Sequence, residues 1–129
     1  TYGGQKADTP GNENAAQLIP MLIAGFDAIF VGHDHAGWDG QGYDPATKAK
    51  IDVKDPNGKV VPIYGALNDA RKIAVVKMTI SYNKATKKVE VTQAGELRDM
   101  AKTTPDAAFV KTFEKQIAEA KDWVTTPIG

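Results

Sequence analysis

The feature that most constrains the fold of this chain is a short apolar run that leads into two histidines. Residues 26–32 read FDAIFVG, with β-branched and aromatic side chains between Gly25 and Gly32. This pattern is typical of a strand that is buried on both faces. A helix-like segment precedes the run, and a helix followed by a buried strand predicts a layered α/β fold.

The preceding helix is expected from about Glu13 to Ala24. Its apolar residues recur at helical spacing: Ala15, Ala16, Leu18, Ile19 and Leu22. Asn12 or Asn14 can cap the first turn by accepting hydrogen bonds from its unpaired amides. Gly25 is expected to close the helix. Because proline disrupts helical hydrogen bonding, Pro20 is expected to kink or shorten it.

A long connection and a hairpin are predicted next. Residues 36–59 are rich in Gly, Asp, Pro and Lys, which predicts a functional loop or a β-hairpin excursion. Within it, KDPNGK predicts a turn between the extended pieces KAKIDVK and VVPIYG. The segments KIAVVKMTISYN and KKVEVTQAGEL alternate in polarity and predict two antiparallel strands, joined by a turn near NKATK.

The C-terminal segment predicts an amphipathic helix of about five turns. Thr104 and Pro105 are expected at its N-cap and first helical position. Its apolar stripe consists of Phe109, Phe113, Ile117, Ala120 and Val124. Phe109, Phe113 and Trp123 are expected to pack in the core or against another domain.

Composition narrows the range of functions. The 129 residues suffice for one domain. Lys plus Arg and Asp plus Glu number 16 each, so no basic face for a nucleic acid polymer is expected. Because cysteine is absent, disulfides and thiolate metal sites are excluded. No apolar run approaches the roughly 20 residues of a membrane span, and residues 1–14 show no signal-peptide pattern.

His33 and His35 follow the predicted buried strand. In extended geometry, a spacing of two residues directs both imidazoles to one side and Asp34 to the other. Gly32 allows a close approach of the backbone, and ligands collect at the carboxyl ends of strands in α/β sheets. The pair is therefore a candidate metal site. The alternative is two polar residues at the end of an ordinary strand.

A family resemblance rests on the same segment. GFDAIFVGHDH, residues 25–35, resembles the G-x-D-x-I-x-x-G-H-x-H segment of the calcineurin-like metallophosphoesterases, in particular the branch of secreted 5′-nucleotidases and 2′,3′-cyclic-nucleotide phosphodiesterases. GNENAAQL and VVPIYG are similar to its Glu-Asn helix start and its V-P strand. The order of elements matches over residues 11 to about 92. The terminal helix ending in TPIG is similar to the linker helix that leads into the nucleotidase substrate-binding domain.

The resemblance implies a fold, a site and a reaction. The fold would be part of a four-layer α/β/β/α sandwich, with residues 1–104 as the C-terminal part of the phosphoesterase domain and residues 105–129 as a linker helix. His33 and His35 would each bind one of two divalent metal ions, namely zinc, manganese or iron, with Asp34 outside the first shell. A metal-activated water would hydrolyse nucleotide or cyclic-nucleotide phosphate esters. The location would be periplasmic or secreted.

The chain departs from the family pattern in what it lacks. The Asp-x-His, Gly-Asp and Gly-Asn-His motifs, and a further His before a Ser-Gly pair, are absent, and no third histidine exists. Asn68 also stands where the branch usually has a second glycine. We therefore expect a C-terminal part of a phosphoesterase domain that is inactive alone and self-associates through exposed core surface. The alternative is a non-catalytic α/β module that binds a metal or a partner. No catalytic or substrate-binding side chain is assigned.

Other polar and aromatic residues have two interpretations each. Asp39, Asp44, Asp52 and Asp55 match no EF-hand spacing, and a solvated acidic loop is favoured over a calcium site. Trp38 and Tyr43 could stack on a nucleobase or anchor the loop against the core. The lysines of NKATKK, residues 83–88, are favoured as the polar tip of a hairpin over a phosphate-binding patch.

Overall fold

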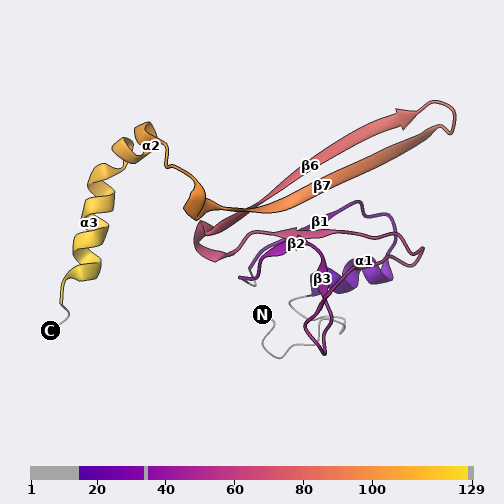
Figure 1. The fold of residues 1–129 in the computed structure, drawn as a ribbon, viewed down its shortest axis with the longest axis horizontal. Coiled ribbons are helices and arrows are strands. Elements are labelled where there is room, and N and C mark those ends of the chain that lie inside the picture. The colour runs from indigo at the N-terminus through magenta and orange to yellow at the C-terminus, as the bar shows by residue number, and fades with distance from the viewer. Residues whose placement is uncertain (1–14, 34, 128–129) are drawn as a thin grey trace.

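The computed structural model describes residues 15–33 and 35–127. The chain contains short helices and mixed sheets, in agreement with the predicted α/β class (Figure 1). The elements, in chain order, are η1 (Ala15–Gln17), α1 (Leu18–Leu22), β1 (Ile29–Val31), β2 (Trp38–Gly40), β3 (Gly42–Tyr43), β4 (Lys50–Ile51), β5 (Ile63–Gly65), η2 (Asn68–Ala70), β6 (Lys72–Asn83), β7 (Lys88–Asp99), η3 (Met100–Lys102), α2 (Ala107–Thr112) and α3 (Glu114–Thr125).

The first helix is shorter than the sequence predicts. A 3-10 turn, η1, leads into α1, which ends at Leu22 with Ile23 as its C-cap, rather than at Gly25. Pro20 lies in the first turn of α1, where its missing N–H costs no helical hydrogen bond. The expected caps Asn12 and Asn14 lie outside the described residues.

Gln17 ties this helix to the loop that follows the first strand. Its side chain is buried, and its amide both donates to the carbonyl of Tyr43 and accepts from the Tyr43 N–H, each at 2.8 Å. The amide thus satisfies both backbone groups of Tyr43 as a neighbouring strand would.

A three-stranded mixed sheet holds the small core. Its order is β1-β5-β2, with β1 parallel and β2 antiparallel to the central β5. One face packs Trp38 and Ile63 against Val53, from the long connection. The prediction that the first strand is buried on both faces is wrong. Phe30 lies on the opposite face of β1 and is 62% exposed. The reason is that β1 is an edge strand, and on this face of the sheet the neighbouring Tyr64 is covered but Phe30 is not.

The long connection forms small turns and strands. β3 and β4 pair in antiparallel fashion, and Lys54 bridges to Val60. The predicted turn at KDPNGK is confirmed: the buried Asp55 carboxylate accepts from the N–H groups of Asn57 and Lys59, both at 2.9 Å. Gly58 adopts a φ of 82° there, a conformation that glycine allows without strain.

The predicted hairpin is confirmed in full register. β6 and β7 pair from Lys72 with Asp99 to Asn83 with Lys88. The Asn83 carboxamide shapes the turn by accepting from the N–H groups of Ala85 and Thr86. At its base the hairpin packs over the second face of the sheet, where Gly95 lies against the Tyr64 ring. Its far half projects away from the sheet (Figure 1).

The C-terminal helix differs from its prediction in three respects. Asp106, rather than Thr104, caps it by accepting from the Phe109 N–H at 2.7 Å. The helix breaks at Phe113, whose φ of −107° and ψ of 12° separate α2 from α3. Every described residue after Met100 is exposed, so the aromatic residues expected in a core are not buried among the described residues.

Candidate functional site

The two histidines follow β1, on a segment that leaves the sheet. Both side chains are exposed, and both residues adopt left-handed backbone conformations, with φ of 74° at His33 and 58° at His35. The expectation of extended geometry here is therefore wrong. Because the strand ends at Val31, the alternation that would align the two imidazoles does not reach them. Asp34, expected to point away from the pair, lies outside the described residues.

The neighbouring strand ends at the same edge of the sheet. β1 and β5 are parallel, and Val31 is in register with Gly65 at their carboxyl ends. After β5 comes the turn η2, in which Asp69 and Ala70 have φ of 57° and 52°. Four of the six non-glycine residues with positive φ in the described chain therefore follow these two strands. The other two, Lys48 and Lys87, lie in the turns of the two hairpins.

Left-handed conformations cost free energy in residues with a side chain. Such strain gathers at ligand sites, which in α/β sheets lie at the carboxyl ends of strands. The left-handed residues and the carboxyl ends of the parallel strands thus indicate a ligand site at the sheet edge where the histidine motif lies. The sequence pattern did not indicate the η2 part of this edge. The only signal was Asn68 in the place of an expected glycine.

The polar side chains of η2 bond to one another. Asn68 donates through Nδ2 to Asp69 Oδ2 at 2.6 Å and accepts from Arg71 Nη2 at its side-chain oxygen. Arg71 Nε also donates to the Asn68 carbonyl at 3.5 Å. Asn68 therefore holds both a carboxylate and a guanidinium in place at the carboxyl end of β5.

Trp38 and Tyr43 anchor the loop that carries His35. Trp38 is 5% exposed, and its ring meets that of Tyr43 edge to face, with centroids 5.3 Å apart. The Tyr43 hydroxyl donates to the Gly37 carbonyl at 3.1 Å. In this structure Trp38 therefore anchors the loop against the core, rather than being free to stack on a nucleobase. These contacts fix the chain two residues beyond His35.

The acidic residues of the long connection act as structural groups. Asp39 pairs with Lys50, whose pKa is raised by this hydrogen bond. Asp52 accepts from the Gln41 side chain at 3.2 Å, and Asp55 forms the turn described above. Asp44 accepts from the N–H groups of Ala46 and Thr47. Each carboxylate thus has a partner within the chain.

The donor set provides only part of a metal centre. Imidazole nitrogens suit zinc, manganese or iron, and His33 and His35 offer two at one sheet edge. Within residues 15–33 and 35–127, no three His, Asp or Glu side chains gather closely enough to hold an ion. A dinuclear centre needs more ligands than this pair supplies.

Compared with protein families, curated proteins and solved structures, the sequence gives no match. In the part of the chain that the structure describes, no helix is long and apolar enough to cross a membrane.

Proposed function

We propose that this chain is the C-terminal part of a metal-dependent phosphoesterase domain, with His33 and His35 as ligands in a dinuclear centre. One observation carries the proposal. The Gly-His-x-His motif, with Gly32 before the histidines, follows β1 at the carboxyl edge of a parallel strand pair, where α/β proteins bind ligands. The strained backbone after β5 supports the same edge.

The proposed substrates are nucleotide or cyclic-nucleotide phosphate esters. When bound, a pair of divalent ions would activate a water molecule and neutralise charge on the phosphoryl group. The contribution of this chain is positional. His33 and His35 present imidazole donors on a loop that Trp38 and Tyr43 fix to the sheet. The substrate class is inferred from the resemblance of residues 25–35 to the metallophosphoesterase segment.

The test uses a longer protein that contains this segment and the ligands it lacks. There, His33→Ala and His35→Ala should each lower kcat/KM for bis(p-nitrophenyl) phosphate at least about a hundredfold, because metal sites lose 10–100-fold even when only outer-shell partners are changed. Asp52→Ala, a change at an exposed carboxylate in the long connection, is the matched control. Turnover that both histidine variants retain would contradict the proposal.

The 129-residue chain by itself is expected to lack phosphatase activity, because its described residues hold no complete ligand set. Purified chain with added zinc or manganese should not release product from bis(p-nitrophenyl) phosphate or AMP. Turnover that His35→Ala abolishes would overturn this expectation.

The alternative is a non-catalytic module that binds a metal or a partner. The exposed apolar faces of the far hairpin and of α3 favour it, since such surfaces mark interaction sites. A longer protein that binds metal through both histidines but hydrolyses no phosphate ester would support this alternative.

A further inference from the structure

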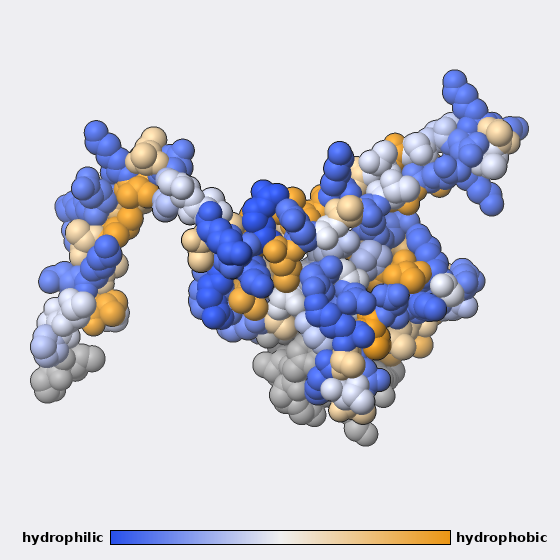
Figure 2. All heavy atoms as spheres, viewed as in Figure 1, coloured by the Kyte–Doolittle hydropathy of each residue, from blue (hydrophilic) through white to orange (hydrophobic). Residues whose placement is uncertain are grey.

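The helix α3 presents an apolar stripe that no described part of the chain covers. All its residues are exposed, and Val124 is 73% exposed. In Figure 1, α3 stands apart from the sheet and the hairpin. Figure 2 shows apolar atoms along the segment formed by α2 and α3. Amphipathic helices are stable chiefly through packing of such a stripe, so this face requires a partner.

The stripe has the spacing of a coiled-coil seam. Steps of three and four residues alternate through Val110, Phe113, Ile117, Ala120 and Val124. In heptad notation the β-branched residues occupy position a, and Phe113 and Ala120 occupy position d. The seam is regular within α3, which begins just after the break at Phe113.

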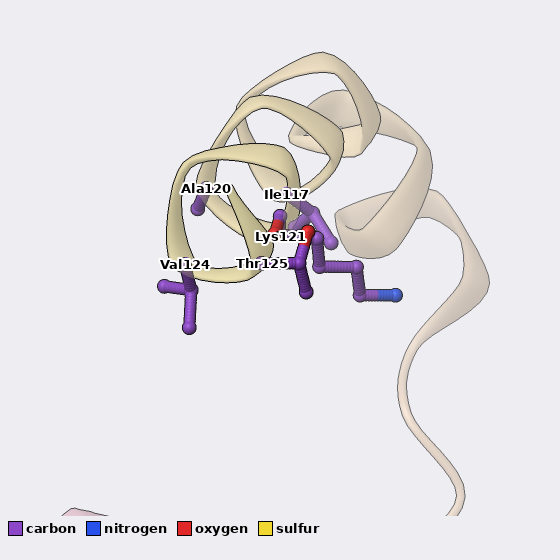
Figure 3. A pocket seen from close by; sticks show the side chains of 5 residues that line it. All are labelled: Ile117, Ala120, Lys121, Val124 and Thr125. Carbon is purple, nitrogen blue, oxygen red and sulfur yellow. Dashed lines mark hydrogen bonds between the residues drawn. The ribbon is translucent and has the colours of Figure 1, made fainter. Parts of the chain in front are cut away.

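An open, shallow hollow lies on this seam. Figure 3 shows it between Ile117, Ala120, Lys121 and Val124, with Thr125 beside them. Positions a, d, e and the next a form a hole for one side chain of a facing helix. Because Ala120, one of the residues that border this hollow, is small, a large apolar side chain of a facing helix is needed to fill it.

The direction of the facing helix follows from that space. In a parallel pair of α3 helices, Ala120 would face Ala120 and leave a void. In an antiparallel pair, residues of type a face residues of type d, and Ile117 of the partner subunit enters the hole above Ala120. Two-fold symmetry then fills both holes in the same way.

The charges beside the seam favour the same direction. Glu114 and Lys121 are the two flanking residues at position e. With Ile117 opposite Ala120, an antiparallel pair places each Glu114 within about 3 Å, along the helix axis, of Lys121 of the partner subunit. A parallel pair would place Phe109 and Gln116 opposite these charges instead.

We propose that α3 is a self-association element through which two copies of this chain pack antiparallel about a two-fold axis. Ile117 is the central contact, and two Glu114–Lys121 pairs set the direction. Exposed ion pairs contribute little to affinity, and two three-turn helices bury less than a standard interface of about 1,600 Å². The dimer is therefore weak. This inference does not depend on the proposed phosphoesterase function.

Charge reversal tests the proposal by sedimentation equilibrium of the full chain from about 10 µM to about 1 mM. Glu114→Lys and Lys121→Glu should each raise the dimer dissociation constant about fivefold to tenfold, since each places like charges together twice. The double variant should return close to the wild-type value. Ile117→Asp should abolish dimerisation, while helix content is followed by circular dichroism.

The matched control is Glu119→Lys, which makes the same charge change on the opposite face, where Glu119 lies 3.7 Å from Lys115. Its dissociation constant should equal that of the wild type. A chain that stays monomeric throughout, single variants without effect, or a double variant that stays weak would each overturn the proposal.

Introduced cysteines test direction independently, since the chain has none. A mixture of Ile117→Cys and Ala120→Cys chains should form the mixed disulfide under mild oxidation. Val124→Cys should not cross-link to itself, because the antiparallel arrangement separates the two positions by about 16 Å along the axis. Rapid self-linkage at Val124 would show a parallel pair and overturn the proposed direction.

Discussion

At the scale of single residues, the backbone conformation of the histidine segment is the feature that the residue types do not predict. The histidine pair illustrates the limit of sequence reasoning. The motif around Gly32 predicts where the strand ends. Histidine tolerates a left-handed φ but does not require it, so the conformations of His33 and His35 could not be predicted from their residue types. Alternation is informative only inside a strand, and both histidines lie beyond it.

Ala70 should be replaceable by glycine with a gain in stability. Its φ of 52° is strained for a residue with a Cβ and unstrained for glycine. We expect Ala70→Gly to raise the free energy of unfolding by about 0.5–1 kcal/mol, measured by urea denaturation. Ala66→Gly is the control, because Ala66 has no positive φ and should lose stability. Equal losses in both variants would contradict this explanation.

Asp44 should make the turn between β3 and β4 sensitive to acid. Hydrogen bonds lower the pKa of the Asp44 carboxyl below its ordinary value of 3.8, and those from Thr47 have a larger effect than the one from Ala46. This stabilisation is complete above the unfolded-state pKa and is lost as pH falls through the lower folded-state value. The difference in the free energy of unfolding between the wild type and Asp44→Asn should therefore decrease as the pH falls from the unfolded-state pKa to the folded-state pKa of Asp44. A difference that is constant from about pH 7 to pH 2 would contradict this.

At the scale of secondary-structure elements, periodicity predicted the hairpin and the C-terminal helix well. It could not predict which faces become buried. The strand at residues 29–31 reads as buried on both sides because Ile29, Phe30 and Val31 are all apolar, yet burial depends on what packs above each face. Likewise the break at Phe113 interrupts an unbroken helical pattern, and no glycine or proline in the sequence marks it.

Docking of the hairpin onto the sheet should depend on Gly95. A Cβ at this position would overlap the ring of Tyr64, which is buried beneath it. We expect Gly95→Ala to lower the free energy of unfolding by about 1–3 kcal/mol, as overpacked sites do. Gly32→Ala is the comparison, because a Cβ there meets no atom within 4 Å. Thermal unfolding curves that coincide for Gly95→Ala and the wild type would show that the hairpin is not seated on Tyr64.

At the scale of the whole molecule, the described residues form a small core and leave apolar side chains of the hairpin and of α3 exposed. The α/β class followed from the order of a helix and an apolar strand. The four-layer sandwich implied by the resemblance stays a prediction, because its layers depend on segments that pair across the sheet. For the same reason the motif predicted two candidate ligands, but not the geometry of a complete site.

The most direct measurement is the binding of zinc to the purified chain, followed by NMR of the two imidazole rings and by calorimetry. We expect weak binding that shifts both rings, and a loss of at least about tenfold in affinity in His33→Ala and in His35→Ala. Asp52→Ala should bind as the wild type does. Zinc binding that leaves both rings unshifted and survives both histidine substitutions would contradict the assignment of this sheet edge as a metal site.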